Sequence, residues 1–77
     1  MSIFDSKAEA YNTPIFVAAK GQAIRAFEDQ INTEDSEFNK HPEDYTLFYI
    51  GEFDSDTGQI ISTNPESLGV ALEYKRT

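Results

Sequence analysis

The chain has 77 residues, no cysteine, a single histidine and a formal net charge of −8, from six Lys and Arg against fourteen Asp and Glu. This length supports one domain over residues 1–77, and the lack of cysteine excludes disulfides and thiolate metal sites. A chain this short can bury only a small core, and its six Phe and four Tyr supply much of the apolar surface available for one. Sharing part of their apolar surface makes a homodimer a reasonable expectation.

The first part of the chain is predicted to be extended. Residues 2–5 and 15–18 suit strands because they are rich in aromatic and β-branched side chains, whereas 6–12 remain undecided. Thr13-Pro14 interrupts the run because proline has no N–H for a strand ladder. The start of the chain lacks a basic region followed by an apolar core, and no run approaches a membrane span. We therefore expect a cytoplasmic protein without membrane contact.

Residues 21–32 carry the clearest helical pattern. One apolar stripe along this segment is formed by Ala23, Ile24, Phe27 and Ile31. The acidic segment from Glu34 to Glu37 that follows is predicted to be a loop, pinned to the core by Phe38.

Residues 45–53 form the strongest predicted strand. Both of its alternating faces are largely apolar, so the strand is central or covered on both sides. The connection Asp54 to Gly58 predicts a hairpin, with Gly58 in the left-handed conformation and a return strand at 59–62.

The last segment is less decisive. Asn64-Pro65 has the pattern of a helix start, and a helical turn at 65–68 followed by a strand is slightly favoured. Residues 69–75 are left open between helix and strand. The predicted fold class is α+β, a small antiparallel sheet packed against one amphipathic helix at about 21–32.

No group of residues indicates catalysis. His41 lies beside Glu43 and Asp44, but no local Ser or Cys is positioned as a nucleophile. The segment that starts at Asp54 begins like a calcium loop but lacks the Gly and the Glu that an EF-hand requires at its sixth and twelfth positions. The four glycines are isolated, so no phosphate-binding loop exists. We expect a binding protein and not an enzyme, with no cofactor and no metal.

Aromatic and basic residues lie near one another in two stretches of the chain. Such residues hold single-stranded nucleic acid by stacking on bases and by pairing with phosphates, although the aromatic residues also suit the core of a small domain. The candidate nucleic-acid-binding residues are Lys7, Tyr11, Lys20, Arg25, Lys40 and Tyr45. The strong acidity opposes phosphate binding. The net charge fits three alternatives: a solvated surface that keeps the protein soluble, a basic patch hidden in a negative average, or an acidic face that docks on a basic protein.

The run from His41 to Asp54, HPEDYTLFYIGEFD, resembles the small nonstructural protein of gokushoviruses, single-stranded DNA phages of the microvirus group. The opening residues 3–11, the helix residues 23–27 and the closing residues 67–74 resemble it in the same order. The resemblance implies a protein that is absent from the mature particle and assists single-stranded DNA synthesis or packaging, by analogy with the small protein C of the phi-X-like coliphages. It implies no catalytic or ligand residues.

The leading hypothesis is therefore a nonstructural phage protein that contacts either single-stranded DNA or the phage replication and capsid machinery. The alternative is an acidic interaction module, a DNA mimic or host-directed regulator, that binds a basic protein. The position of the charges distinguishes them, because acids around the whole surface favour the module and a bare basic face favours DNA.

Overall fold

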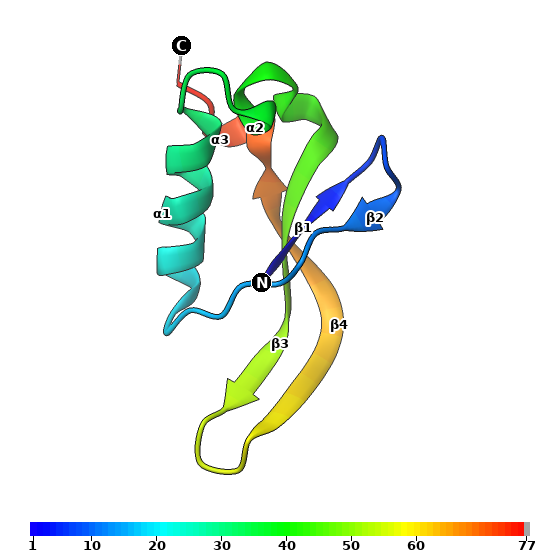
Figure 1. Cartoon of the computed structure of the whole chain (residues 1–77), viewed down its shortest axis with the longest axis vertical. Helices are drawn as coiled ribbons and strands as arrows, with labels where there is room; N and C mark the ends of the chain where they lie inside the picture. Colours follow the sequence, from blue (N-terminus) through cyan, green and yellow to red (C-terminus); the bar gives the residue numbers. More distant parts are fainter. Residues whose placement is uncertain (77) are drawn as a thin grey trace.

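The computed structural model describes residues 1–76. Its strands form one four-stranded antiparallel sheet in the order β2-β1-β3-β4, and helix α1 lies along one side of it (Figure 1). The strands are β1 (Ser2–Asp5), β2 (Ala10–Tyr11), β3 (Tyr45–Asp54) and β4 (Gln59–Val70). The helices are α1 (Lys20–Ile31), α2 (Glu37–Lys40), the 3-10 turn η1 (Pro42–Asp44) and α3 (Ala71–Tyr74). The predicted α+β class is confirmed. Within residues 1–76, none of the helices has the length and apolar character that crossing a membrane requires.

The core forms where the apolar stripe of α1 meets the sheet. The buried residues of the helix are Ala23, Phe27 and Ile31. They recur every four residues and therefore share one side of the helix. Leu47 of β3, which is 1% exposed, meets them from the sheet. The helix predicted at 21–32 is thus confirmed, with its bounds shifted by one residue.

Strand β3 is central, because it pairs with β1 on one side and with β4 on the other. This confirms the prediction from its two apolar faces. The predicted turn is also confirmed: the Asp54 carboxylate accepts hydrogen bonds from the N–H groups of Asp56 at 2.9 Å and Thr57 at 3.4 Å, and Gly58 has φ +75°. The β3–β4 hairpin extends past the N-terminal end of α1 (Figure 1).

The chain after α1 is anchored by Phe38, as predicted. The Phe38 ring centre lies 6.1 Å from that of Phe27 and 4.6 Å from that of Tyr45. The side-chain amide of Asn39 donates to the carbonyl oxygen of Ile31 at 2.8 Å. These contacts hold α2 against the C-terminal end of α1.

The predicted strand at 15–18 is wrong. Residues 12–19 have no regular secondary structure, and the short strand β2 forms earlier in the chain. The Ile15 N–H donates to the Met1 carbonyl oxygen at 2.8 Å, and the Met1 amino group donates to the Ile15 carbonyl oxygen at 3.0 Å. Pro14 has no N–H to extend this pairing into a ladder, so these apolar residues remain on the exposed edge of the sheet.

The predicted helical turn at 65–68 followed by a strand is also wrong, and the order of the two elements is reversed. β4 continues through this segment to Val70, and the short helix α3 follows it. Pro65 is compatible with β4 because this is an edge strand and its register with β3 shifts between Tyr49 and Gly51. Edges and irregularities are where a strand tolerates a residue without an N–H.

Helix α3 is fastened to both the sheet and α1. The Tyr74 hydroxyl donates to the carbonyl oxygen of Leu68 at 2.5 Å, and its ring passes over Gly69, where a β-carbon would lie 2.8 Å from the ring. The side chain of Asn32 donates to the Tyr74 carbonyl oxygen at 3.2 Å and accepts from the Arg76 N–H at 2.7 Å. The end of α1 and the last described residues therefore hold each other in place.

Candidate interaction surfaces

The six candidate nucleic-acid-binding residues are spread over the fold. They occupy the β1–β2 turn (Lys7), β2 (Tyr11), α1 (Lys20 and Arg25), α2 (Lys40) and β3 (Tyr45). Lys20 and Arg25 are five positions apart on α1, which places them about 140° apart around the helix axis. Among the described residues, no hydrogen bond, ion pair or ring contact joins any two of the six. The structure therefore does not gather these basic and aromatic residues into one patch.

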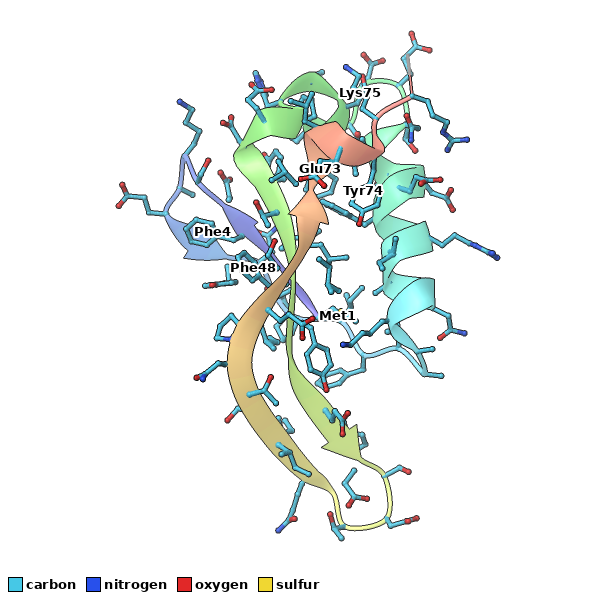
Figure 2. The ribbon with its side chains drawn as sticks, turned by 180° about the vertical axis from the view of Figure 1, so that it is seen from behind. Met1, Phe4, Phe48, Glu73, Tyr74 and Lys75 are labelled. Carbon is cyan, nitrogen blue, oxygen red and sulfur yellow. The ribbon has the colours of Figure 1, made fainter. Side chains whose placement is uncertain are left out.

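Tyr11 belongs to an aromatic cluster on the side of the sheet away from α1. Its ring centre lies 4.9 Å from that of Phe4 and 5.6 Å from that of Phe48, and those two rings are 6.4 Å apart. Figure 2 shows Phe4 and Phe48 beside the strands, opposite the helix. Tyr11 is 48% exposed. Phe4 and Phe48 were not among the predicted site residues, although the alternation of β3 placed Phe48 on the face opposite Leu47.

Lys20 is already engaged with other side chains at the start of α1. Its Nζ lies 4.4 Å from the centre of the Tyr49 ring and 3.7 Å from a Glu66 carboxylate oxygen. The Tyr49 hydroxyl donates to Glu52 at 2.8 Å, and this hydrogen bond raises the pKa of Tyr49. The ammonium group is therefore already paired with the Glu66 carboxylate and the Tyr49 ring, which makes this position a poor phosphate site.

A groove of about 370 Å³ lies beside Lys20, between residues 15–20 and the hairpin. Its floor includes Tyr49, Gly51 and Phe53 of β3. Phe16 lies at its side, with its ring centre 5.8 Å from that of Phe53. The groove is thus lined by both polar and apolar groups, and its Lys20 ammonium group is already paired with Glu66.

Half of the acidic residues lie in residues 28–44, at the end of the molecule formed by α2, η1 and the C-terminal end of α1 (Figure 1). Three of them, Glu34, Asp35 and Glu37, lie in and next to the turn between α1 and α2, and we call them the acidic loop. Their side chains form no hydrogen bond or ion pair with residues 1–76. The other acidic residues are distributed over β1, the β1–β2 turn, the hairpin, β4 and α3. Acidic side chains therefore occur on most parts of the fold.

His41, Glu43 and Asp44 form a small polar cluster in and before η1. Their potential ligand atoms all lie within 4.8 Å of one another, and His41 and Glu43 are exposed. The short turn begun by the buried Pro42 brings them together. Because they lie in solvent and no nucleophile accompanies them, we assign no catalytic or metal-binding role to the cluster.

Tyr45, predicted as a stacking residue, instead packs against Phe38 at the edge of the core. Burial raises the pKa of its phenol above the ordinary 10.0, and Asp5, Glu37 and Asp44 raise it further. A raised pKa means that the folded state favours the protonated phenol. The stability that this preference contributes is therefore complete below about pH 10 and is lost as the pH rises through the higher pKa of the folded state.

We accordingly expect the free energy of unfolding to fall more steeply above about pH 10 in the natural chain than in Tyr45→Phe. Urea unfolding followed by circular dichroism at a series of pH values from neutral to about pH 11 measures the two slopes. Parallel curves for the two proteins would contradict the assignment.

Two comparisons with known proteins both point to phage ORF5 proteins. The family model described as Phage ORF5 protein matches residues 1–74. The chain is also similar to Protein ORF5 of Chlamydia phage 1, with 40% identity over 62 residues. That match covers 75% of this chain and 65% of the relative, so the chain spans less than two thirds of the length of the curated relative it matches. No solved structure matches the chain.

Proposed function

Because the chain belongs to the Phage ORF5 protein family, we propose that it assists viral single-stranded DNA synthesis or packaging as a nonstructural phage protein. It acts by binding and not by catalysis, in the cytoplasm of the host, and is absent from the mature particle. Its partner is a basic component of the replication or capsid machinery. The resemblance to gokushovirus nonstructural proteins supports the process, and the charge distribution supports the kind of partner.

The observation that carries the choice of partner is the acidic loop. Its three carboxylates lie within four residues and have no partner among residues 1–76. Lys and Arg side chains of a partner can therefore pair with them without breaking a contact within the chain. Complementary charge of this kind speeds association and selects the partner. The candidate bases, in contrast, are dispersed, and Lys20 already faces Glu66.

The acidic loop can be tested by neutralising it. The triple variant Glu34→Gln, Asp35→Asn and Glu37→Gln removes three negative charges from one place. If each exposed charge contributes about 0.5 kcal/mol, affinity for the basic partner should fall about tenfold. The measurement is calorimetric titration of the protein with the purified replication initiator and major capsid protein of the same phage, at low and at physiological salt.

The matched control is the triple variant Glu9→Gln, Asp29→Asn and Asp56→Asn. It changes the net charge equally, but its positions lie on three separate segments, and these side chains also form no hydrogen bond or ion pair with residues 1–76. Its affinity should change by less than about twofold. Equal losses in the two variants would show a general charge effect and contradict a localised docking site. If the protein bound neither phage protein, the result would favour the alternative function, an acidic module that binds a basic protein of the host.

Direct binding to single-stranded DNA is the second candidate, favoured by one observation. Tyr11 presents an exposed ring within the aromatic cluster, on the same β1–β2 hairpin as Lys7. Stacking on such a ring contributes about 1–3 kcal/mol per base. The same purified protein is titrated against a labelled single strand by fluorescence anisotropy. Binding that weakens with salt and is lost in Tyr11→Ala, with a flatter salt dependence in the double variant Lys20→Ala and Arg25→Ala, would place the protein on the strand.

A further inference from the structure

The outer edge of β4 is open in its first half. β4 is the last strand of the sheet, pairs only with β3 among the described residues, and is exposed from Gln59 to Ser67. Its second half carries Pro65 and contains both register shifts with β3, and such irregularities discourage pairing with another strand. The first half, 59–63, has neither a proline nor a charge. It therefore presents an unprotected strand edge.

The same half-strand is unusually apolar for an exposed segment. Ile60 is 69% exposed and Ile61 is 49% exposed. Ile60 lies directly across the ladder from Phe53, which in turn contacts Phe16. These three side chains form a continuous apolar row that crosses the hairpin to its open edge. Soluble monomers rarely expose contiguous patches of this kind without a partner.

We propose that residues 59–63 pair with the same residues of a second copy of this chain, antiparallel, about a two-fold axis near Ile61. The two sheets then join through their β4 edges. A two-fold pairing is self-complementary, so it uses both open edges and stops at a dimer. The apolar rows of Phe16, Phe53 and Ile60 from the two copies meet at the axis, where cross-strand neighbours pack against each other.

Charge favours a second copy over another partner on this edge. A copy with a charge of −8 is repelled by most of the surface, but residues 59–63 bring no acid to the interface. A basic partner would be attracted to the acidic surface and would gain nothing from this neutral strand. The hairpin extends beyond the N-terminal end of α1 (Figure 1), and within residues 1–76 no helix or strand pairs with its outer edge. The inference stands independently of the proposed function.

Sedimentation equilibrium of the full chain over a wide concentration range tests the proposal. The natural protein should show a reversible monomer–dimer equilibrium that tightens as salt rises, because salt screens the repulsion between two acidic copies. Binding to phosphate would show the opposite dependence on salt. Ile61→Lys should weaken the dimer about a hundredfold, since it sets two like charges opposite each other in an apolar pairing.

Two controls locate the contact. Leu72→Lys makes the same change at a side chain that is 58% exposed on α3, and should leave the dimer intact. The chain has no cysteine, so Ile61→Cys should form a disulfide-linked dimer on mild oxidation, because residues opposite each other across an antiparallel pair meet disulfide geometry. Ser67→Cys lies about 20 Å along the strand and should not. A monomer at all concentrations, a dimer insensitive to Ile61→Lys, or equal cross-linking at both positions would overturn the proposal.

Discussion

Replacing Gly51 by Ala is expected to destabilise the protein severely. A β-carbon at this position would overlap the carbonyl oxygen of Ile61 and lie 3.0 Å from the α-carbon of Ser62. Both are backbone atoms of β4, and moving them would break the pairing between β3 and β4. The φ angle of Gly51, +152°, is also one that side-chain-bearing residues rarely adopt.

The combined strain and overlap should cost about 3 kcal/mol or more. A chain of 77 residues has a total stability near the lower end of about 5–15 kcal/mol. The loss is therefore a large part of what holds the fold. Urea unfolding followed by circular dichroism should show a much lower midpoint, or no cooperative transition.

Gly21→Ala is the matched control for this variant. A β-carbon there meets nothing within 4 Å, and the residue lies in the first turn of α1. Alanine is the better helix former, so this variant should be more stable by about 0.5–1 kcal/mol. Similar midpoints for the two alanine variants would refute the close approach of the strands at Gly51.

The second large effect is expected for Leu47→Ala. Leu47 is 1% exposed and lies among the few buried side chains that join β3 to α1, including Phe27 and Ile31. Removing its branched end leaves a cavity beneath the helix, which costs about 2–5 kcal/mol when neighbours do not collapse into it. Because the core is so small, little other buried surface compensates for the loss.

Thermal unfolding of Leu47→Ala is best compared with Leu72→Ala and Leu47→Met. Leu72 is largely exposed, so its truncation should change stability by less than about 0.5 kcal/mol. Methionine has nearly the same volume as leucine and should cost less than about 1.5 kcal/mol at the core position. If Leu47→Ala melted at the same temperature as Leu72→Ala, α1 would not be held to the sheet in the way described here.

The two proposed surfaces lie at opposite ends of a molecule whose longest extent is 42 Å (Figure 1). Joining two copies through their β4 edges leaves both acidic loops directed away from the axis. Such a dimer presents two acidic ends to a partner, and a partner with repeated basic sites would bind both at once. Two linked contacts bind more tightly than either contact alone. Ile61→Lys should then weaken docking on an assembled capsid more than docking on a single capsid protein.

The local sequence determined the helix and the strand along which the apolar residues recur at a regular spacing from end to end. The four-residue spacing of Ala23, Phe27 and Ile31 predicted α1, because a helix with one apolar stripe gains most by packing that stripe. The alternation in 45–53 predicted a central strand, and the aspartate-rich connection closed by Gly58 predicted the hairpin. The net charge of −8 indicated the acidic surface that supports the proposed partner.

Tertiary contacts decided the rest, since the local signals were weak or misleading. Asn64-Pro65 has the pattern of a helix start, but Ser62 before it and Glu66 after it both pair with β3. The segment therefore continues as a strand across the register shift. Tyr11 and Tyr45 looked alike as stacking residues. The β1–β2 hairpin and the pairing of β1 with β3 placed Tyr11 beside Phe4 and Phe48, whereas Tyr45 packs against Phe38 at the edge of the core. Which residues share a surface depends on strand order and register, and these are set by contacts between segments far apart in the chain.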